Sequence, residues 1–424
     1  MITTVHPVPL SGTLRVIPSK SAAHRAILMS ALAQGETCVS PLQFSRDIDA
    51  TLDCAKVLGL CACRERGKSF VRLLGGMTPG DMPLRTLDCG ESGSTLRFMI
   101  PLALDGHGPV RLIGHGRLMQ RPLGVYEQLF APLGVRWQPE ADALVIEGKL
   151  RGGEYALRGD VSSQFITGLL FALPLCEGDS VIHITTHLES RAYVELTRRI
   201  QAAFGVRSHW ENAQTLLIPG GQRAVSPESF LVEGDWSHAA FYLIAGAIGQ
   251  GGPVTLTGLD MDSTQGDRAI ADILRQMGAD IRISSEGVTA YPSPLRGVQA
   301  DVMQTPDLVP ALAVAMAAAK GESRITGAAR LRIKESDRLS AMKNALCAAG
   351  ADASELPDGL IIRGGAPLHA AVIDGCNDHR IVMSMAVAAA CLSRAPLEIT
   401  DAQAVSKSAP LFWEEFTSLG GIAR

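Results

Sequence analysis

The sequence has no long hydrophobic run. Its longest apolar stretches, such as residues 165–176, fall short of the roughly 18 residues that a membrane-spanning helix needs. The first residues, from Met1 to Pro7, lack the basic start and the apolar core of a secretory signal. These absences argue against a membrane or exported protein, and we expect a soluble protein of the cytoplasm.

An excess of positive charge is missing as well. The chain has 39 Lys and Arg against 43 Asp and Glu, which gives a formal net charge of −4. Because nucleic-acid binding normally requires a basic surface, no general affinity for nucleic acid is expected. A site for an anion must therefore be a local cluster of cations.

A metal-binding cysteine pattern is also absent. Nine cysteines are scattered along the chain, and Cys61 with Cys63 has no second pair to complete a site. His183 and His187 are four residues apart, but their surroundings are β-branched and predict a strand. We therefore expect reduced thiols and no metal.

What the sequence does contain is a repeat. With 424 residues the chain is long enough for two or three domains. Amphipathic segments that end in glycine, the residue expected at the left-handed end of a helix, recur every 70 to 75 residues. The six glycines are Gly59, Gly134, Gly205, Gly278, Gly350 and Gly420.

A second series of segments runs in phase with the first. It consists of apolar, alanine-rich helices, each followed by a turn and a short strand. These helices are expected at 22–33, 95–104, 165–175, 239–248, 308–319 and 381–392. Each repeat therefore reads helix, strand, helix, strand, strand over about 72 residues.

The last repeat lacks its final strands, whereas the chain begins with two unassigned strands at about 3–9 and 12–18. We expect this N-terminal hairpin to complete the last repeat. Residues 19–234 would then form one lobe of three repeats, and residues 1–18 with 235–424 the other. Two chain crossings would join the lobes, and such lobes can close around a ligand.

Polar residues collect at the expected helix starts. The stretch 331–339 has five charged side chains between Arg332 and Arg338. If the repeats are arranged alike, the cations at these starts converge on one cleft, which would suit bound phosphates or carboxylates. The cations are Lys20, Arg25, Arg97, Arg121, Lys334, Arg338, Arg380 and Lys407. Among the carboxylates there, Asp307 and Glu335 are candidate general bases, whereas Asp378 is expected to cap a helix.

In order along the chain, these residues resemble the 5-enolpyruvylshikimate-3-phosphate (EPSP) synthases, the 3-phosphoshikimate 1-carboxyvinyltransferases. The resemblance covers essentially the whole chain. The matching stretches are Ser19-Lys20-Ser21 with Arg25, Gly93-Ser94 with Arg97, Arg121-Pro122, Val161-Ser162-Ser163-Gln164-Phe165, Ser190 with Tyr193, Pro306-Asp307, Lys334-Glu335-Ser336-Asp337-Arg338, Asn377-Asp378-His379-Arg380 and Lys407.

The resemblance implies an α/β fold of two lobes, each of three βαβαββ repeats, with the active site in the interdomain cleft. It also implies a transferase that joins the enolpyruvyl group of phosphoenolpyruvate to the 5-hydroxyl of shikimate 3-phosphate through a tetrahedral intermediate and releases phosphate. That reaction is the sixth step of the shikimate route to chorismate and the aromatic amino acids. No cofactor, nucleic acid or membrane is implied, and a monomer is expected.

The resemblance also assigns roles to residues. Shikimate 3-phosphate would be held by Lys20, Ser21, Arg25, Ser162, Ser163, Gln164, Ser190, Tyr193, Asp307 and Lys334. Phosphoenolpyruvate would be held by Lys20, Gly93, Arg121, Gln164, Arg338, Arg380 and Lys407. Asp307 would take the hydroxyl proton and Glu335 would protonate the methylene, with Lys20 assisting. Because Gly93 leaves space beside phosphoenolpyruvate, glyphosate is expected to compete with that substrate.

Three residues depart from the usual pattern of this family. Glu91 stands where asparagine is usual, Phe98 where proline often follows the arginine, and Ala409 where an aromatic residue is usual. A carboxylate beside a carboxylate substrate is unfavourable unless it points away or pairs with a cation, so Glu91 bears on phosphoenolpyruvate affinity.

Three alternatives are open. A UDP-N-acetylglucosamine enolpyruvyl transferase would usually carry a cysteine in the loop at 114–120 and asparagine in place of Ser21, and neither is present. A non-catalytic scaffold that binds phosphorylated ligands would not need Asp307 or Glu335. An RNA-end cyclase is disfavoured by the net negative charge.

Overall fold

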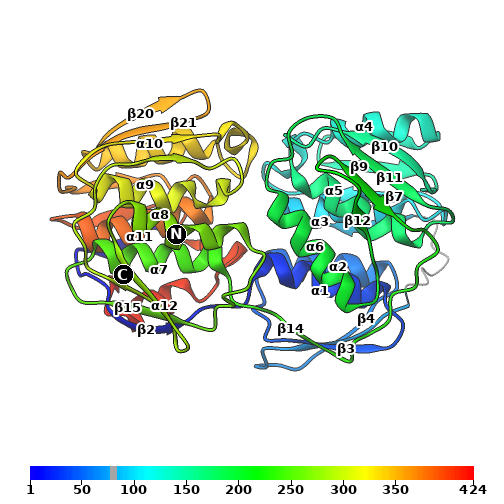
Figure 1. Ribbon diagram of the computed structural model, residues 1–424, viewed down its shortest axis with the longest axis horizontal. Helices are drawn as coiled ribbons and strands as arrows, with labels where there is room; N and C mark the ends of the chain where they lie inside the picture. Colours follow the sequence, from blue (N-terminus) through cyan, green and yellow to red (C-terminus); the bar gives the residue numbers. More distant parts are fainter. Residues whose placement is uncertain (77–83) are drawn as a thin grey trace. The chain divides into compact units, whose positions relative to one another are not determined.

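The computed structural model describes residues 1–76 and 84–424 and divides into two compact units (Figure 1). Unit 1 consists of Met1–Ile17 and Glu233–Arg424, and unit 2 of Pro18–Val232. Each unit has a hydrophobic core of its own. The chain passes between the units twice, after Ile17 and after Val232.

The described residues form six four-stranded sheets, three in each unit, all with the same topology. The first two strands of each repeat pair in parallel, and the last two pair antiparallel, with the fourth strand lying against the second strand of the repeat. In four repeats a helix connects the first two strands, as a parallel pair requires, whereas in the first and fourth repeats the first strand comes from a distant part of the chain. Another helix precedes the third strand in every repeat. The predicted two-lobe fold of βαβαββ repeats is therefore confirmed.

Unit 2 contains the first three repeats. The first is β14 (Ser229–Leu231), α1 (Lys20–Leu32), β3 (Glu36–Ser40), α2 (Arg46–Val57), β4 (Cys61–Arg64) and β5 (Val71–Leu74). The second is β6 (Arg85–Asp88), α3 (Gly93–Ala103), β7 (Val110–Ile113), α4 (Gly124–Phe130), β8 (Arg136–Pro139) and β9 (Ala143–Glu147). The third is β10 (Gly153–Leu157), α5 (Ser163–Ala172), β11 (Ser180–Ile184), α6 (Arg191–Ala203), β12 (His209–Trp210) and β13 (Thr215–Ile218).

Unit 1 contains the other three. The fourth is β2 (Gly12–Arg15), α7 (Trp236–Ile248), β15 (Val254–Thr257), α8 (Ile270–Gln276), β16 (Asp280–Ser284) and β17 (Gly287–Tyr291). The fifth is β18 (Gln299–Asp301), α9 (Val309–Ala318), β19 (Gly321–Thr326), α10 (Arg338–Ala348), β20 (Asp352–Leu356) and β21 (Gly359–Gly364). The sixth is β22 (Ala371–Ile373), α11 (His379–Leu392), β23 (Leu397–Ile399), α12 (Phe412–Ser418), β24 (Ile422–Ala423) and β1 (Thr3–His6).

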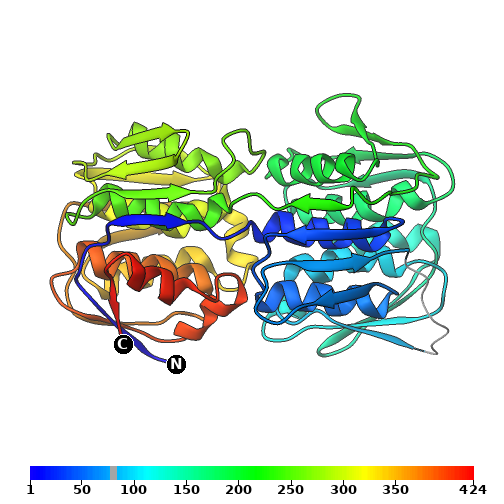
Figure 2. The same ribbon diagram turned by 90° about the horizontal axis from the view of Figure 1, so that it is seen from below.

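The prediction that both N-terminal strands complete the last repeat is wrong for one of them. β1 does complete it, because it pairs with both β23 and β24. β2 instead pairs in parallel with β15 and supplies the first strand of the fourth repeat. Pro7 and Pro9 lie between the two strands, and proline cannot donate to a sheet ladder. Figure 2 shows both blue strands among the strands of unit 1.

The first helix of each repeat is an inner helix. These helices are buried almost all round, as α9 shows, where every residue from Val309 to Ala317 is buried. A helix without a polar face belongs inside a core, and its alanines let neighbouring helices approach closely. In unit 2, α3 and α5 lie side by side (Figure 1). Among the described residues, no helix has the length and apolar character needed to cross a membrane.

Candidate active site

In unit 2, Arg25 is a buried cation on the inner helix α1. Only 3% of the residue is exposed. Its Nε donates to Thr197 Oγ1 at 2.8 Å, and its other N–H groups reach the backbone carbonyls of Ser21 and Tyr193. Among the residues that the structure describes, it has no carboxylate partner. Burial lowers the pKa of Arg25 to about 10, so it stays charged at neutral pH. A buried cation without a counterion is suited to binding an anion.

The structure explains why phenylalanine stands at position 98, where proline is frequent in the family. Its ring centroid lies 5.3 Å from the guanidinium carbon of Arg25 and 5.4 Å from the ring of Phe171. An aromatic face stabilises a cation that has left water. The departure at Phe98 therefore accompanies the burial of Arg25. Tyr193 contributes a second ring, 5.8 Å from the same carbon.

Two more arginines gather at the start of α3. A β-carbon placed on Gly93 would lie 2.6 Å from Arg121 Nη1 and 3.1 Å from Arg97 Nη1. Arg97 Nη1 also donates to Gln164 Oε1 at 2.8 Å, and Gln164 Nε2 donates to Ser94 Oγ at 3.0 Å. Glycine at position 93 therefore leaves room for two guanidinium groups beside the free amides of a helix start.

Hydrogen bonds fix the inner helices α3 and α5 relative to each other. The hydroxyl of Tyr126 donates to the carbonyls of Arg97 at 3.0 Å and Phe165 at 2.8 Å, which ties α3 to α5. Ser162 caps α5 by accepting from the backbone N–H of Gln164. Ser163 is buried beside it. Arg97 and Gln164 therefore project from fixed backbones.

The remaining predicted residues of unit 2 lie at helix starts too. Lys20, the first residue of α1, binds Asp47 with Nζ to Oδ2 at 2.7 Å. Ser190 occupies the N-cap position of α6 without a side-chain capping bond, in a left-handed conformation with φ of 52°. That conformation is uncommon outside glycine and is found at functional sites. Glu91 lies against the neighbouring loop, because a β-carbon on Gly116 would meet its Oε2 at 2.7 Å.

In unit 1, Arg338 binds three carboxylates at once. Only 1% of it is exposed. Nε donates to Asp378 Oδ2 at 2.8 Å and Nη1 to Asp307 Oδ1 at 2.9 Å. Nη2 donates to Glu335 Oε2 at 2.7 Å and to Asp378 Oδ1 at 3.3 Å. Among the described residues, these bonds occupy four of its five N–H groups, so a single N–H of Nη1 remains for a ligand.

Asp307 lies between several cations. Arg380 Nη2 is 3.5 Å and Lys334 Nζ is 3.8 Å from its carboxylate, in addition to the bond from Arg338. Burial alone would raise the pKa of Asp307, but these three charges outweigh it and hold the pKa well below its ordinary value. Burial also lowers the pKa of Lys334 to about 8, against the opposing effect of Asp307.

The starts of α10 and α12 differ from the prediction. Lys334 and Glu335 lie in a link between a 3-10 turn (Ala329–Ile333) and α10, which begins only at Arg338. Asp337 caps α10 by accepting from Ser340 N, so the helix start lies four residues later than expected. Lys407 ends a 3-10 turn instead of opening α12, and its Nζ donates to the carbonyl of Asn377 at 2.6 Å.

Asp378 caps α11, as predicted, and also accepts hydrogen bonds from two side chains of the α10 region. Its Oδ1 accepts from Arg380 N at 2.9 Å, while its Oδ2 accepts from Ser336 Oγ and Arg338. Burial would raise the pKa of Asp378, yet the charge of Arg338 outweighs it and lowers the pKa. Ala409, the third departure from the family pattern, is packed into the core of unit 1.

Asp267 was not predicted. It is buried and accepts a hydrogen bond from the hydroxyl of Ser237. Burial, and next the negative charge of Asp307, raise the pKa of Asp267 to about 6, while Arg380 opposes the shift. The sequence signal was weak, because Asp267 stands only four residues after Ser263, near the start of the amphipathic segment that ends at Gly278.

The structure therefore brings the predicted residues together as two groups. The unit 2 group has Lys20, Ser21, Arg25, Gly93, Arg97, Arg121, Ser162, Ser163, Gln164, Ser190 and Tyr193, and the unit 1 group has Asp307, Lys334, Glu335, Arg338, Asp378, Arg380 and Lys407. Both groups combine cations with helix starts, which suits anionic substrates.

Comparison with known proteins decides the family. The profile described as "EPSP synthase (3-phosphoshikimate 1-carboxyvinyltransferase)" matches residues 5–416. The 3-phosphoshikimate 1-carboxyvinyltransferase of Clostridium novyi (strain NT) is 42% identical over 425 residues, which cover 98% of this chain and 97% of that protein. The chain belongs to the EPSP synthase family. The enzyme of the same name from Clostridium perfringens (strain 13 / Type A) is 43% identical over 423 residues, covering 99% and 98% of the two chains.

Solved structures agree with this assignment. EPSP synthase from Acinetobacter baumannii superposes with a TM-score of 0.80 at 27% identity, and the match covers both chains completely. The enolpyruvyl transferase NikO from Streptomyces tendae has a TM-score of 0.81 at 17% identity, covering 100% of this chain and 98% of that one, and shows the shared fold. The prediction of a transferase of this family is confirmed, and the UDP-N-acetylglucosamine alternative is not favoured.

Proposed function

We propose that this chain transfers the enolpyruvyl group of phosphoenolpyruvate to the 5-hydroxyl of shikimate 3-phosphate and releases phosphate. The observation that supports it best is the group at Gly93, where the guanidinium groups of Arg97 and Arg121 and the amide of Gln164 meet at one helix start. This arrangement is suited to a small dianion such as phosphoenolpyruvate.

Each substrate carries a carboxylate and a phosphate, so the reaction needs several cations. For shikimate 3-phosphate, Arg25 and Lys20 of unit 2 are the main candidates, with Lys334 of unit 1. For phosphoenolpyruvate, Arg121 would act with Arg380 and Lys407, and Arg338 would contribute its remaining N–H. Residues of both units would thus serve one reaction. The cations among these residues would neutralise the phosphate that leaves, so no metal or organic cofactor is required.

The proton transfers fall to carboxylates. As the 5-hydroxyl attacks the enol carbon, Asp307 would accept its proton, and Glu335 would protonate the methylene, with Lys20 assisting. In the ligand-free chain, Arg380, Lys334 and Arg338 keep the pKa of Asp307 low, which makes it a weak base. Anionic substrates that share those cations would raise its basicity, so Asp307 would gain strength as a base only when the substrates are bound.

The elimination step reverses these roles. The tetrahedral intermediate loses a methyl proton to Glu335 as the C–O bond to phosphate breaks, and the enol double bond forms again. The leaving phosphate takes up the proton that Asp307 accepted from the 5-hydroxyl, so both carboxyl groups return to their starting states. We further propose that the protein acts as a cytoplasmic monomer.

The test is phosphate release from phosphoenolpyruvate and shikimate 3-phosphate in metal-free buffer. We expect release that depends on both substrates and falls about 100- to 1,000-fold in Lys20→Ala, because loss of one preorganised group costs that order of rate. Lys56→Ala is the matched control, since Lys56 is an exposed lysine of the same unit that pairs with Asp53.

Two other outcomes would contradict the proposal. Release with UDP-N-acetylglucosamine, and none with shikimate 3-phosphate, would indicate the sister reaction. Calorimetric binding of both substrates without turnover would indicate a scaffold that only binds phosphorylated ligands.

A further inference from the structure

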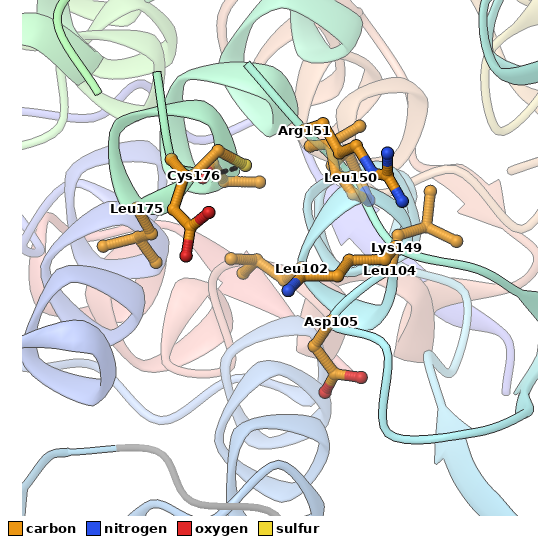
Figure 3. Close-up of a pocket in the computed structure, with 11 residues that line it drawn as sticks. Leu102, Leu104, Asp105, Lys149, Leu150, Arg151, Leu175 and Cys176 are labelled. Carbon is orange, nitrogen blue, oxygen red and sulfur yellow. Dashed lines mark hydrogen bonds between the residues drawn. The ribbon is translucent and has the colours of Figure 1, made fainter. Parts of the chain in front are cut away.

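Unit 2 contains a cavity of about 490 Å³ away from the helix starts described above. It lies at the opposite ends of α3 and α5, and the segment that follows β9 forms its third side (Figure 3). Its size lies within the roughly 300–1,000 Å³ of small-molecule sites. α3 has 11 residues, so it separates this cavity from Gly93 by about 16 Å.

Apolar side chains form part of the walls of the cavity. Leu102 and Leu104 come from the end of α3, Leu150 from the segment after β9, and Ala172 from the end of α5. All four are buried, with 2% to 7% of each exposed. Leu175 completes the rim and is 40% exposed. An apolar body of ligand size would be removed from water here.

Two cations and two acids line the cavity. Lys149 and Arg151 both line it, and within the described part of the chain neither forms an ion pair. Asp105 also lines it, but its carboxylate is bound to the buried Arg85, with one N–O distance of 2.8 Å. In Figure 3 the side chain of Lys149 extends past Leu104 toward Leu102, whereas the carboxylate of Asp105 points away. Glu177 is the remaining acid.

Several carbonyls at the helix ends beside the cavity are engaged in hydrogen bonds. Carbonyl groups at the C-terminal end of a helix carry partial negative charge when they are free. Here the carbonyls of Leu104, Pro174 and Cys176 accept hydrogen bonds from the backbone N–H groups of Leu150, Gln222 and Gly221. These three carbonyls are therefore engaged, which reduces the negative potential that an anionic group beside Lys149 would meet.

We propose that this cavity is a second binding site, which takes a small organic anion with an apolar body, such as an aromatic or branched carboxylate or sulfonate. Lys149 binds the anionic group, Arg151 assists at the rim, and the leucines cover the apolar part. An ordinary role for Lys149, in which its stem merely covers Gly106, would leave the cavity without affinity for such a ligand.

Binding is tested with anilinonaphthalene sulfonate, a fluorescent anion of this class, in the presence of saturating shikimate 3-phosphate. The added substrate separates this site from the candidate active site, and the result does not depend on turnover. We expect binding to weaken at least about tenfold in Lys149→Gln and to stay within about threefold in Lys149→Arg, because a charge-assisted bond is lost only in the first. Lys56→Gln is the surface control, and Lys149→Gln should keep full phosphate release.

The position of the probe is tested through Cys176, which lines the cavity. We expect the probe to slow alkylation of Cys176 by iodoacetamide at least about fivefold in the complete protein, as measured peptide by peptide by mass spectrometry. The exposed Cys61 and Cys63 serve as internal controls and should not change. Equal probe affinity in Lys149→Gln and the parent, unaltered Cys176 alkylation, or displacement of the probe by shikimate 3-phosphate would each overturn the proposal.

Discussion

The buried arginines differ in what neutralises them. Arg338 is surrounded by Asp307, Glu335 and Asp378, whereas Arg25 has hydroxyl, carbonyl and aromatic neighbours but no carboxylate among the described residues. Burying a charge is costly unless something compensates for it. Arg338 is compensated by the protein itself, and Arg25 would be compensated by an anionic ligand. We therefore propose that Arg338 chiefly organises the candidate site and that Arg25 binds a substrate anion.

Gly93→Ala should reduce affinity for phosphoenolpyruvate. The new methyl group would lie 2.6 Å from Arg121 Nη1, so the guanidinium must move away. We expect the KM for phosphoenolpyruvate to rise about tenfold or more, with kcat changed less. Gly124→Ala is the control, because its methyl group would meet nothing within 4 Å.

Inhibition by glyphosate provides a second test of the role of Gly93. We expect glyphosate to raise the apparent KM for phosphoenolpyruvate in the parent enzyme and to do so much less in Gly93→Ala. An unchanged KM at millimolar glyphosate in the parent would contradict competition at this site.

The pKa of about 8 at Lys334 predicts a pH dependence. A lysine loses its charge as pH rises through its pKa, so the ammonium is about 90% present at pH 7 and about 10% present at pH 9. If Lys334 binds shikimate 3-phosphate, calorimetry should show affinity falling up to about tenfold over this interval. Lys334→Arg, which stays charged, should remove most of that fall. The same decline in both proteins would exclude Lys334 as its cause.

At the scale of elements, one side chain joins three helix starts. Arg338 begins α10, Asp378 caps α11, and Asp307 lies in the 3-10 turn Pro306–Leu308 just before α9. The position of every carboxylate in the unit 1 group therefore depends on one guanidinium. The tie between α3 and α5 through Tyr126 has the same role in unit 2.

Arg338→Lys should loosen these three starts together. A lysine keeps the charge but cannot donate in three directions, and an imperfectly paired buried cluster costs about 3 kcal/mol or more. Hydrogen exchange of α10 and α11 amides should then accelerate at least about 100-fold. Arg363→Lys is the control, because Arg363 also binds two carboxylates but is 53% exposed. Similar acceleration in both variants would contradict the special role of Arg338.

At the scale of the whole molecule, each unit is completed by a segment that is distant in sequence. β1 is an inner strand of the sixth sheet and β2 the edge strand of the fourth, although α1, which follows them, belongs to unit 2. In unit 2, β14 completes the first sheet by pairing with β3, which lies far earlier in the sequence. The chain returns to unit 1 directly after β14. Unit 1 is therefore built from two separate stretches of chain, whereas unit 2 is the single stretch Pro18–Val232.

Val5→Ala should weaken unit 1 alone. Val5 is fully buried in β1, between β23 and β24, so truncation should cost about 2 kcal/mol. We expect amides of β23 and β24 to exchange about 30-fold faster, and those of β7 and β11 in unit 2 to keep their rates. Thr4→Ala, on the opposite face of the same strand, is the control. Equal acceleration in both units would show that they unfold as one.

Local patterns in the sequence were sufficient to predict the six repeats, the inner helices and most of the cations. Helix and strand periodicity, glycine at helix ends and charge at helix starts depend on neighbouring residues, and so they are visible in the chain itself. The same patterns could not assign β2, because a strand of four residues with one buried side chain fits any parallel neighbour. Its partner is set by which sheet lacks a first strand, and that is known only once both units are folded.

The family and the identity of the charged residues were thus determined by the sequence alone, because the motifs are short and keep their order. Only the tertiary structure decided that Arg338 binds three carboxylates, that Asp267 is a buried neighbour of Asp307, and that Phe98 faces Arg25. The physical reason is that desolvation and Coulomb interactions depend on distances between residues far apart in the chain. Spacing along a sequence does not contain those distances.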